Sequence, residues 1–107
     1  MKEAIQEYQD GLFWKLEDGT QLTIGVTQSA IDQVGTVAEV EISDVGDEFE
    51  LGDWIAEIRG KESTVEVLAP CRLRVTERNE EILEQPTVLE DDPTGDAWML
   101  RVEKLDE

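Results

Sequence analysis

Few residues in this chain could do chemistry. The sequence has no histidine, so neither an imidazole base nor an imidazole metal ligand is available. It has one cysteine, Cys71, which excludes an internal disulfide and a zinc site built from cysteines alone. Because no nucleophile is paired with a base, we expect no catalytic residues and no standalone enzyme.

The single thiol has two interpretations. Arg72 follows Cys71, and a neighbouring guanidinium can lower the pKa of a thiol and make it reactive. Alternation along a strand, however, puts Cys71 on the same face as Leu73 and Val75, which point inward. We therefore favour a cysteine that packs as a small hydrophobic residue.

Carboxylates gather near the C-terminal end, at residues 90–92 and Asp96. Calcium prefers oxygen ligands of this kind, but the spacing is not that of an EF-hand loop. The intervening Pro93, Thr94 and Gly95 are typical of an ordinary turn. We predict no metal site.

The charge balance limits the possible partners. Asp and Glu number 27 against 9 Lys and Arg, a formal net charge of −18. Such a chain repels nucleic acid and anionic lipid, so neither is expected as a partner. No apolar run approaches the roughly 20 residues that span a bilayer, and residues 1–10 lack the apolar core of a signal peptide. We expect a cytoplasmic protein.

Many short strands separated by turns predict an all-β fold with short helices. The length of 107 residues fits one domain, 1–107, with one core. Alternating apolar residues and turn residues predict strands at 12–16, 21–26, 36–42, 54–58, 63–68, 71–76 and 97–102. Short helical segments are expected at 2–9, 27–35 and 80–85. This spacing is typical of a sandwich or barrel.

Short motifs along the chain resemble the H proteins of the glycine cleavage system. The match runs from about Tyr8 to Val102, and the motifs keep the family's order and spacing. They are Ile24-Gly25-Val26-Thr27, Ala30, Val34-Gly35, Val40-Glu41-Ile42, Val45-Gly46, Gly52-Asp53, Glu66-Val67-Leu68-Ala69-Pro70, Asn79-Glu80, Pro93 and Ala97-Trp98-Met99-Leu100.

The resemblance implies a barrel-sandwich hybrid of two small antiparallel sheets. It also implies a non-catalytic carrier in glycine catabolism, which shuttles an aminomethyl group on a covalently bound lipoate. The implied partners are a pyridoxal-phosphate decarboxylase, a folate-dependent aminomethyltransferase, a dihydrolipoyl dehydrogenase and a lipoate ligase.

The attachment motif departs from the family pattern. An ungapped match of residues 52–70 puts Glu62 where the family has its lipoyl lysine, and the one nearby lysine is Lys61. Lys61 is the candidate attachment residue; the alternative is a paralogue that is not lipoylated and acts as a protein-binding module. Leu73 stands where the family has a glycine, and we predict that it is buried.

Basic residues concentrate around the predicted hairpin. Five of the nine lie within a 20-residue stretch: Arg59, Lys61, Arg72, Arg74 and Arg78. They could form a docking face for an acidic partner. We favour instead cross-strand pairing with nearby glutamates, namely Glu57, Glu62, Glu66 and Glu77.

Overall fold

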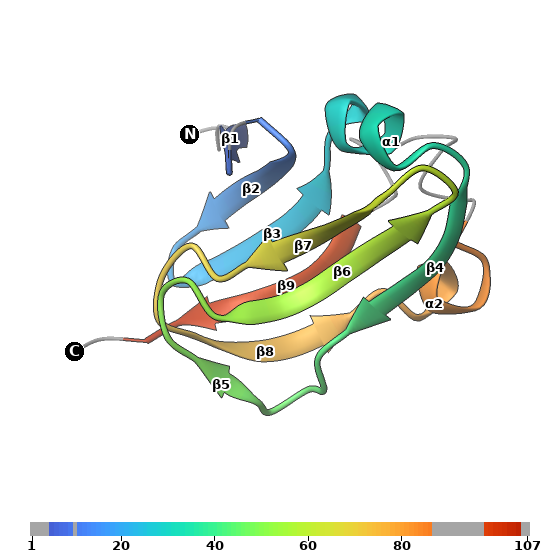
Figure 1. Cartoon of the computed structure of the whole chain (residues 1–107). Helices are drawn as coiled ribbons and strands as arrows, with labels where there is room; N and C mark the ends of the chain where they lie inside the picture. Colours follow the sequence, from blue (N-terminus) through green and yellow to red (C-terminus); the bar gives the residue numbers. More distant parts are fainter. Residues whose placement is uncertain (1–4, 10, 87–97, 106–107) are drawn as a thin grey trace.

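The computed structural model describes residues 5–9, 11–86 and 98–105, and this part of the chain forms two antiparallel β-sheets with two short helices (Figure 1). The larger sheet runs in the order β1 (Ile5–Tyr8), β2 (Phe13–Asp18), β3 (Gln21–Val26), β9 (Trp98–Lys104), β8 (Leu73–Arg78) and β5 (Glu48–Phe49). The smaller sheet has the order β4 (Val37–Ile42), β6 (Trp54–Gly60) and β7 (Thr64–Leu68).

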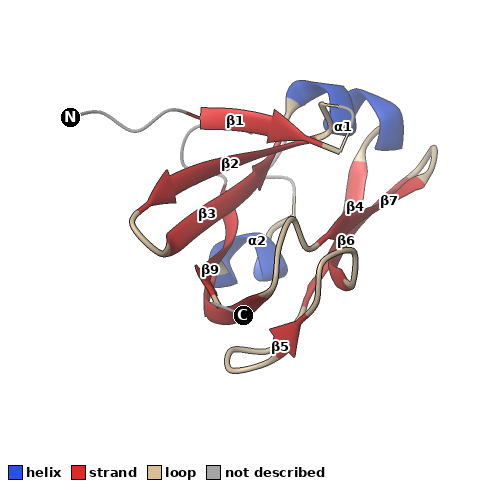
Figure 2. Ribbon diagram, turned by 90° about the vertical axis from the view of Figure 1, so that its left-hand side faces the viewer, coloured by secondary structure: helices blue, strands red, loops and turns tan. Residues whose placement is uncertain are grey.

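The side view in Figure 2 shows the two sheets as separate layers. One hydrophobic core of buried residues from both sheets lies between them. Along β7 and over residues 73–76 of β8, every second residue is buried, as half-buried strands require. The smaller sheet contributes Val40, Ile58, Val65 and Val67, and the larger sheet contributes Leu22, Ile24, Leu73, Val75 and Val102. Leu73 is 0% exposed, so its predicted burial is confirmed. The predicted two-sheet, all-β fold is confirmed, and the sheets do not close into a barrel.

The predicted helical turns at the start of the chain are wrong over the described residues. Residues Ile5–Tyr8 form β1, an edge strand paired with β2 in the register Tyr8↔Phe13. Tertiary contacts explain the difference: the Tyr8 hydroxyl donates to the Leu68 carbonyl oxygen at 3.2 Å, which ties β1 to the other sheet. A weak local preference for helix gives way to these bonds.

Helix α1 (Gln28–Val34) packs across one end of the sandwich, next to β6 and β7. It buries Ala30, Ile31 and Val34 and ends at Gly35, whose φ of 81° is unfavourable for residues with a side chain. Thr27 precedes the helix as predicted, but its hydroxyl does not cap it; it donates to the Gly11 carbonyl oxygen at 2.6 Å.

Helix α2 (Glu80–Glu84) begins after Asn79, whose side-chain oxygen accepts a hydrogen bond from the Glu81 N–H at 3.2 Å. It buries Ile82 in the core. Neither described helix has the length or the apolar run that crossing a bilayer requires.

Candidate functional site

The β6–β7 hairpin carries the candidate lysine at its apex. The register pairs Ile58 with Val65 and Arg59 with Thr64, so the turn is centred between Lys61 and Glu62. Lys61 therefore occupies the first apex position and Glu62 the second, and both are exposed.

Lys61 differs from the other basic residues of the described chain because its ammonium group has no carboxylate or aromatic ring as a partner there. Seven of those groups have a partner: Arg59, Arg72, Arg74, Arg78, Arg101 and Lys104 each pair with a carboxylate, and Lys15 lies 5.7 Å from the centre of the Tyr8 ring. Within the described residues, Lys61 has no carboxylate in ion-pairing range. Its amine is available to another molecule.

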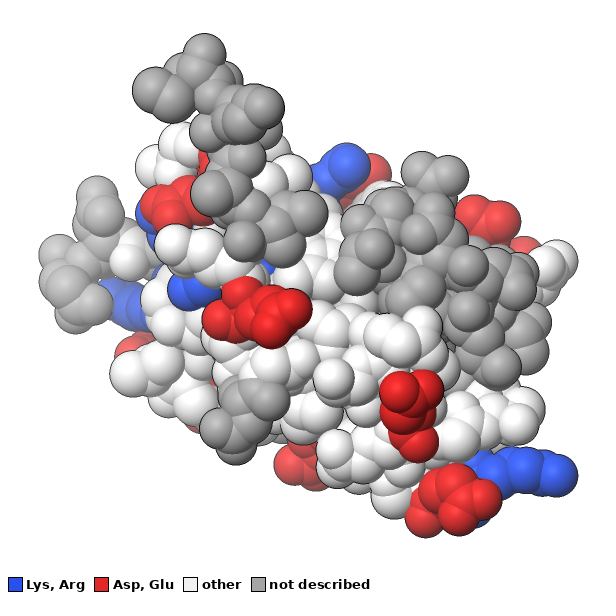
Figure 3. All heavy atoms as spheres, turned by 90° about the horizontal axis from the view of Figure 1, so that it is seen from above, with Lys and Arg blue, Asp and Glu red and all other residues white. Residues whose placement is uncertain are grey.

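The remaining basic residues near the hairpin are neutralised within the chain. Arg59 lies 2.8 Å from a Glu57 carboxylate oxygen and 2.9 Å from one of Glu39, and the hydrogen bond and charge of Glu57 raise the pKa of Arg59. Arg59 and Glu57 both lie on β6, so the cross-strand partner of Arg59 is Glu39 on β4, which the sequence analysis did not name. In the view from above in Figure 3, the blue side chains among the described residues lie close to red ones.

The other predicted pairs form with different partners. Arg72 pairs with Glu50, and Arg74 pairs with Glu48 and Glu103. Their carboxylates come from β5, β9 and the β5–β6 loop, because the order of strands in the larger sheet brings those elements next to β8. These pairs join different elements of the sheet, so the sequence of each predicted hairpin taken separately could not identify the partners.

Helix α1 holds the hairpin apex. The backbone N–H of Lys61 donates to the Thr36 carbonyl oxygen at 3.0 Å, and that of Glu62 donates to the Val34 carbonyl oxygen at 2.8 Å. The Ser63 hydroxyl donates to the Gln33 carbonyl oxygen at 2.9 Å. We call these three contacts the apex clamp. Two of the three acceptors, the Gln33 and Val34 carbonyl groups, lie at the C-terminal end of α1, where carbonyl groups lack partners inside the helix. The third, that of Thr36, lies just after the helix.

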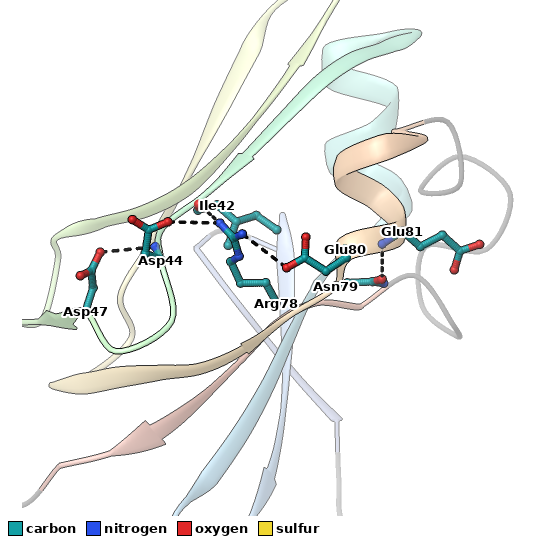
Figure 4. Close-up of polar contacts among 7 residues, drawn as sticks. All are labelled: Ile42, Asp44, Asp47, Arg78, Asn79, Glu80 and Glu81. Atoms are coloured by element: carbon teal, nitrogen blue, oxygen red, sulfur yellow. Dashed lines mark hydrogen bonds and ion pairs between the residues drawn. The ribbon is translucent and has the colours of Figure 1, made fainter.

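Arg78 connects the two sheets at a separate place (Figure 4). Its Nη1 donates to the Ile42 carbonyl oxygen at 3.3 Å and lies 3.4 Å from Asp44, and its Nη2 lies 3.3 Å from Glu80. These contacts join β8 to the end of β4 and to the start of α2. Sequence reasoning did not distinguish Arg78 from the other arginines, because Ile42 and Asp44 lie 36 and 34 positions earlier in the sequence.

Gln9 closes part of the outer edge of β7. Its side-chain amide donates to the Glu66 carbonyl oxygen at 2.6 Å and accepts from the Leu68 N–H at 3.0 Å, as a neighbouring strand would. Gln9 adopts a φ of 57°, which is uncommon outside glycine. Edge strands are open to unwanted pairing, and this amide occupies two of the exposed groups.

Cys71 is half-buried and packs against the core, as the favoured interpretation predicts. Burial raises the pKa of the Cys71 thiol above its ordinary value, so the reactive thiolate is disfavoured. Among the described residues, no three carboxylate or thiol groups gather as metal ligands would. The acidic turn at 90–96 lies outside the described residues.

The fold and the site together define a class: a small two-sheet domain that presents one free lysine at a clamped hairpin apex. The profile of the glycine cleavage H-protein family matches residues 4–107, nearly the whole chain. The chain therefore belongs to the glycine cleavage H-protein family.

Two known proteins with similar sequences are glycine cleavage system H proteins. A glycine cleavage system H protein of Trichormus variabilis is 40% identical over 85 residues, which cover 79% of this chain and 65% of the relative. One of Clavibacter sepedonicus is 38% identical over 89 residues, 83% of this chain and 72% of the relative. The chain thus aligns with just under two thirds of the first relative's length.

A solved structure shares the fold. The crystal structure of a glycine cleavage system H protein from Mycobacterium marinum superposes with a TM-score of 0.86, covering 100% of this chain and 90% of that one. At 20% sequence identity, this likeness speaks for the fold alone.

Proposed function

We propose that this protein is a glycine cleavage-type carrier in which Lys61 is the attachment point for lipoate. Membership of the H-protein family supports the carrier role. The observation that carries the choice of residue is the free ammonium of Lys61 at the apex of a hairpin, beside a family lysine position filled by Glu62.

The residues at the apex fit the demands of a covalent lipoyl group. Attachment needs one exposed primary amine on a protruding turn, so that a long arm can reach several partners. A ligase would join the carboxyl group of lipoate to AMP and release pyrophosphate from ATP. The deprotonated Lys61 Nζ would then attack the acyl carbon, and the amide bond would form as the bond to AMP breaks and AMP leaves. Once bound, lipoate supplies a disulfide that can be reduced and can carry an aminomethyl group.

The protein's own part is to hold and orient, not to catalyse. Its described residues offer a rigid two-sheet base, a clamped apex and an acidic surface. The enzymes it would serve are a decarboxylase, an aminomethyltransferase and a dihydrolipoyl dehydrogenase. Basic surfaces on those partners would be attracted by the net charge of −18.

One observation favours a second candidate function. Glu62 occupies the position where the family has its lysine, and its stem packs against α1 near Gly35. A protein without a lipoyl arm would keep the same scaffold and act by binding other proteins. Modification of Lys61 decides between the two functions.

The test is a ligation reaction on the purified full chain with lipoate, ATP and a lipoate–protein ligase from the same organism, followed by intact-mass measurement. Lys61→Arg removes the amine and keeps the charge; Lys15→Arg is the matched control on a neighbouring sheet. The wild type and Lys15→Arg should gain one lipoyl group, and Lys61→Arg should gain none. No gain by the wild type, with an ordinary H protein modified in the same tube, would favour the armless alternative.

A further inference from the structure

The apex of the β6–β7 hairpin has one closing bond of its own, from the Gly60 N–H to the Ser63 carbonyl oxygen at 2.9 Å, but an unusual backbone conformation. Two-residue hairpin turns that suit the twist of paired strands need a positive φ at one or both apex residues. Neither Lys61 nor Glu62 has a positive φ. Their N–H groups instead donate to the carbonyl oxygens of Thr36 and Val34. The conformation of the apex therefore depends on helix α1 and not on the hairpin alone.

Gly60 makes the approach to the helix possible. A Cβ atom at residue 60 would lie 2.2 Å from the Val34 carbonyl oxygen and 2.7 Å from the Val34 carbonyl carbon. Backbone atoms cannot move aside as the end of a flexible side chain can. Any residue with a side chain at position 60 would push the apex away from α1 and lengthen the bonds of the apex clamp.

Gly35 makes a matching contact from the helix side. A Cβ atom at residue 35 would lie 2.6 Å from Cγ of Glu62, so the stem of Glu62 rests over the glycine that ends α1. The second apex position is thus turned against the helix. The first apex position, Lys61, has an exposed side chain without an ion pair in the described part of the chain.

We propose that Gly60, Gly35 and Ser63 are positioning residues for the carrier lysine: they seat the apex on the C-terminal end of α1, so that Lys61 leaves the surface in one fixed direction. This inference rests on the proposed carrier function. A ligase that must dock onto the apex then meets a preformed amine, because the competent conformation is already populated.

The first arm of the test measures the clamp without any lipoate. Amide hydrogen exchange of Lys61 and Glu62 is compared in the unmodified wild type, Gly60→Ala, Ser63→Ala and Ser63→Thr. Protection of both amides should fall at least tenfold in Gly60→Ala and Ser63→Ala. It should return in Ser63→Thr, which keeps a hydroxyl for the Gln33 carbonyl oxygen. Gly19→Ala, in the distant β2–β3 turn, should leave both amides as in the wild type.

The second arm measures ligation of the same proteins as substrates. A loosened apex spends less time in the competent conformation, so KM for the protein should rise at least fivefold in Gly60→Ala and Ser63→Ala, with kcat little changed. Ser63→Thr and the control Ser29→Ala, an exposed serine on α1, should keep the wild-type KM. If these residues only stabilised the fold, the variants would lower the unfolding midpoint in denaturant, and KM would not rise while kcat stayed the same.

The outcomes separate the two proposals. Unprotected Lys61 and Glu62 amides in the wild type would overturn the clamp, whatever the ligase does. Lost protection with unchanged KM would overturn the positioning role while leaving the carrier function intact. A wild type that accepts no lipoate would sink the carrier function, and the positioning role with it, even where the exchange data show the clamp.

Discussion

Two hairpin turns of this protein place glycine for opposite reasons. In the β2–β3 turn, Gly19 has a φ of 67° and a Cβ there would have nothing within 4 Å. In the β6–β7 turn, Gly60 has no positive φ, yet a Cβ there would lie 2.2 Å from a backbone oxygen. Gly19 is needed because its backbone adopts a positive φ, and Gly60 is needed because a side chain at that position would have no room.

The two turns also differ in their backbone. Gly19 has the positive φ expected of the first central residue in a two-residue hairpin turn, and the Thr20 carbonyl oxygen accepts a bond from the Lys104 N–H at 2.7 Å. The β6–β7 turn has no positive φ at either apex residue; the Gly60 N–H donates to the Ser63 carbonyl oxygen across it, and both apex N–H groups donate to residues at and just after the C-terminal end of α1. The β2–β3 turn carries no residue that we propose to be modified. The β6–β7 turn carries Lys61, whose side chain we propose must point in one direction for modification.

The comparison of the two turns assumes that one hydrophobic core supports both. The substitution with the largest expected effect on stability tests this assumption. Leu73 is 0% exposed in the larger sheet, so Leu73→Ala should lower the free energy of unfolding by about 2–5 kcal/mol. Denaturant unfolding measures this change. Amides beside both turns should lose protection together; loss near one turn only would show that the sheets unfold separately.

The second prediction tests whether each glycine is needed because a side chain would not fit or because its φ is positive. Gly60→Ala should cost about 1–3 kcal/mol by overpacking, and Gly19→Ala about 1–2 kcal/mol by forcing a residue with Cβ into positive φ. Asparagine tolerates positive φ, so Gly19→Asn should be milder than Gly19→Ala. At position 60 asparagine should be worse than alanine. Unfolding midpoints in denaturant give the order, and the same order at both sites would contradict the comparison.

A third prediction concerns the end of β7 farthest from the apex. Burial raises the pKa of Tyr8 above its ordinary value of about 10, with the charge of Cys71 as a smaller cause. The raised pKa contributes stability that is complete below pH 10 and is lost as the pH rises above it. Tyr8→Phe should cost about 1 kcal/mol at neutral pH through the bond to Leu68.

The pH dependence of that variant gives the check. Denaturant unfolding at a series of pH values from 8 upward should show the wild type losing stability above pH 10, while Tyr8→Phe loses less. Parallel curves for the two proteins would mean that Tyr8 does not couple β1 to β7 as described.

The smallest effect lies beside the β2–β3 turn. The hydrogen bond from Lys104 holds the pKa of Glu17 below its ordinary value, with the positive charge of Lys104 as the second cause. The lowered pKa contributes stability that is present above the ordinary value of a glutamate and is lost as the pH falls through the lowered pKa. Glu17→Gln should therefore flatten the decline of stability on the acid side slightly; titration of Glu17 by NMR measures the pKa directly.

Sequence patterns located most of the described strands but not β1, β5 or the clamp. Alternation of buried and exposed residues located the longer strands, and it predicted the burial of Leu73 correctly. The two-residue strand β5 is too short for such a pattern. Residues 5–8 were misassigned because the bonds of Tyr8 and Gln9 to β7 join parts of the chain nearly 60 positions apart. The contact of the apex with α1 was missed for a similar reason: Gly60 was assigned to the turn after residue 58, whereas it ends β6, where a glycine can mark a close backbone approach.

The most direct measurement is the mass of the peptide that contains Lys61, taken from the full chain purified from its native host. The account predicts a lipoyl-sized increase on this peptide and on Lys61 within it. An unmodified Lys61, in cells where an ordinary H protein is lipoylated, would contradict the carrier function and leave a scaffold whose binding partners should then be sought.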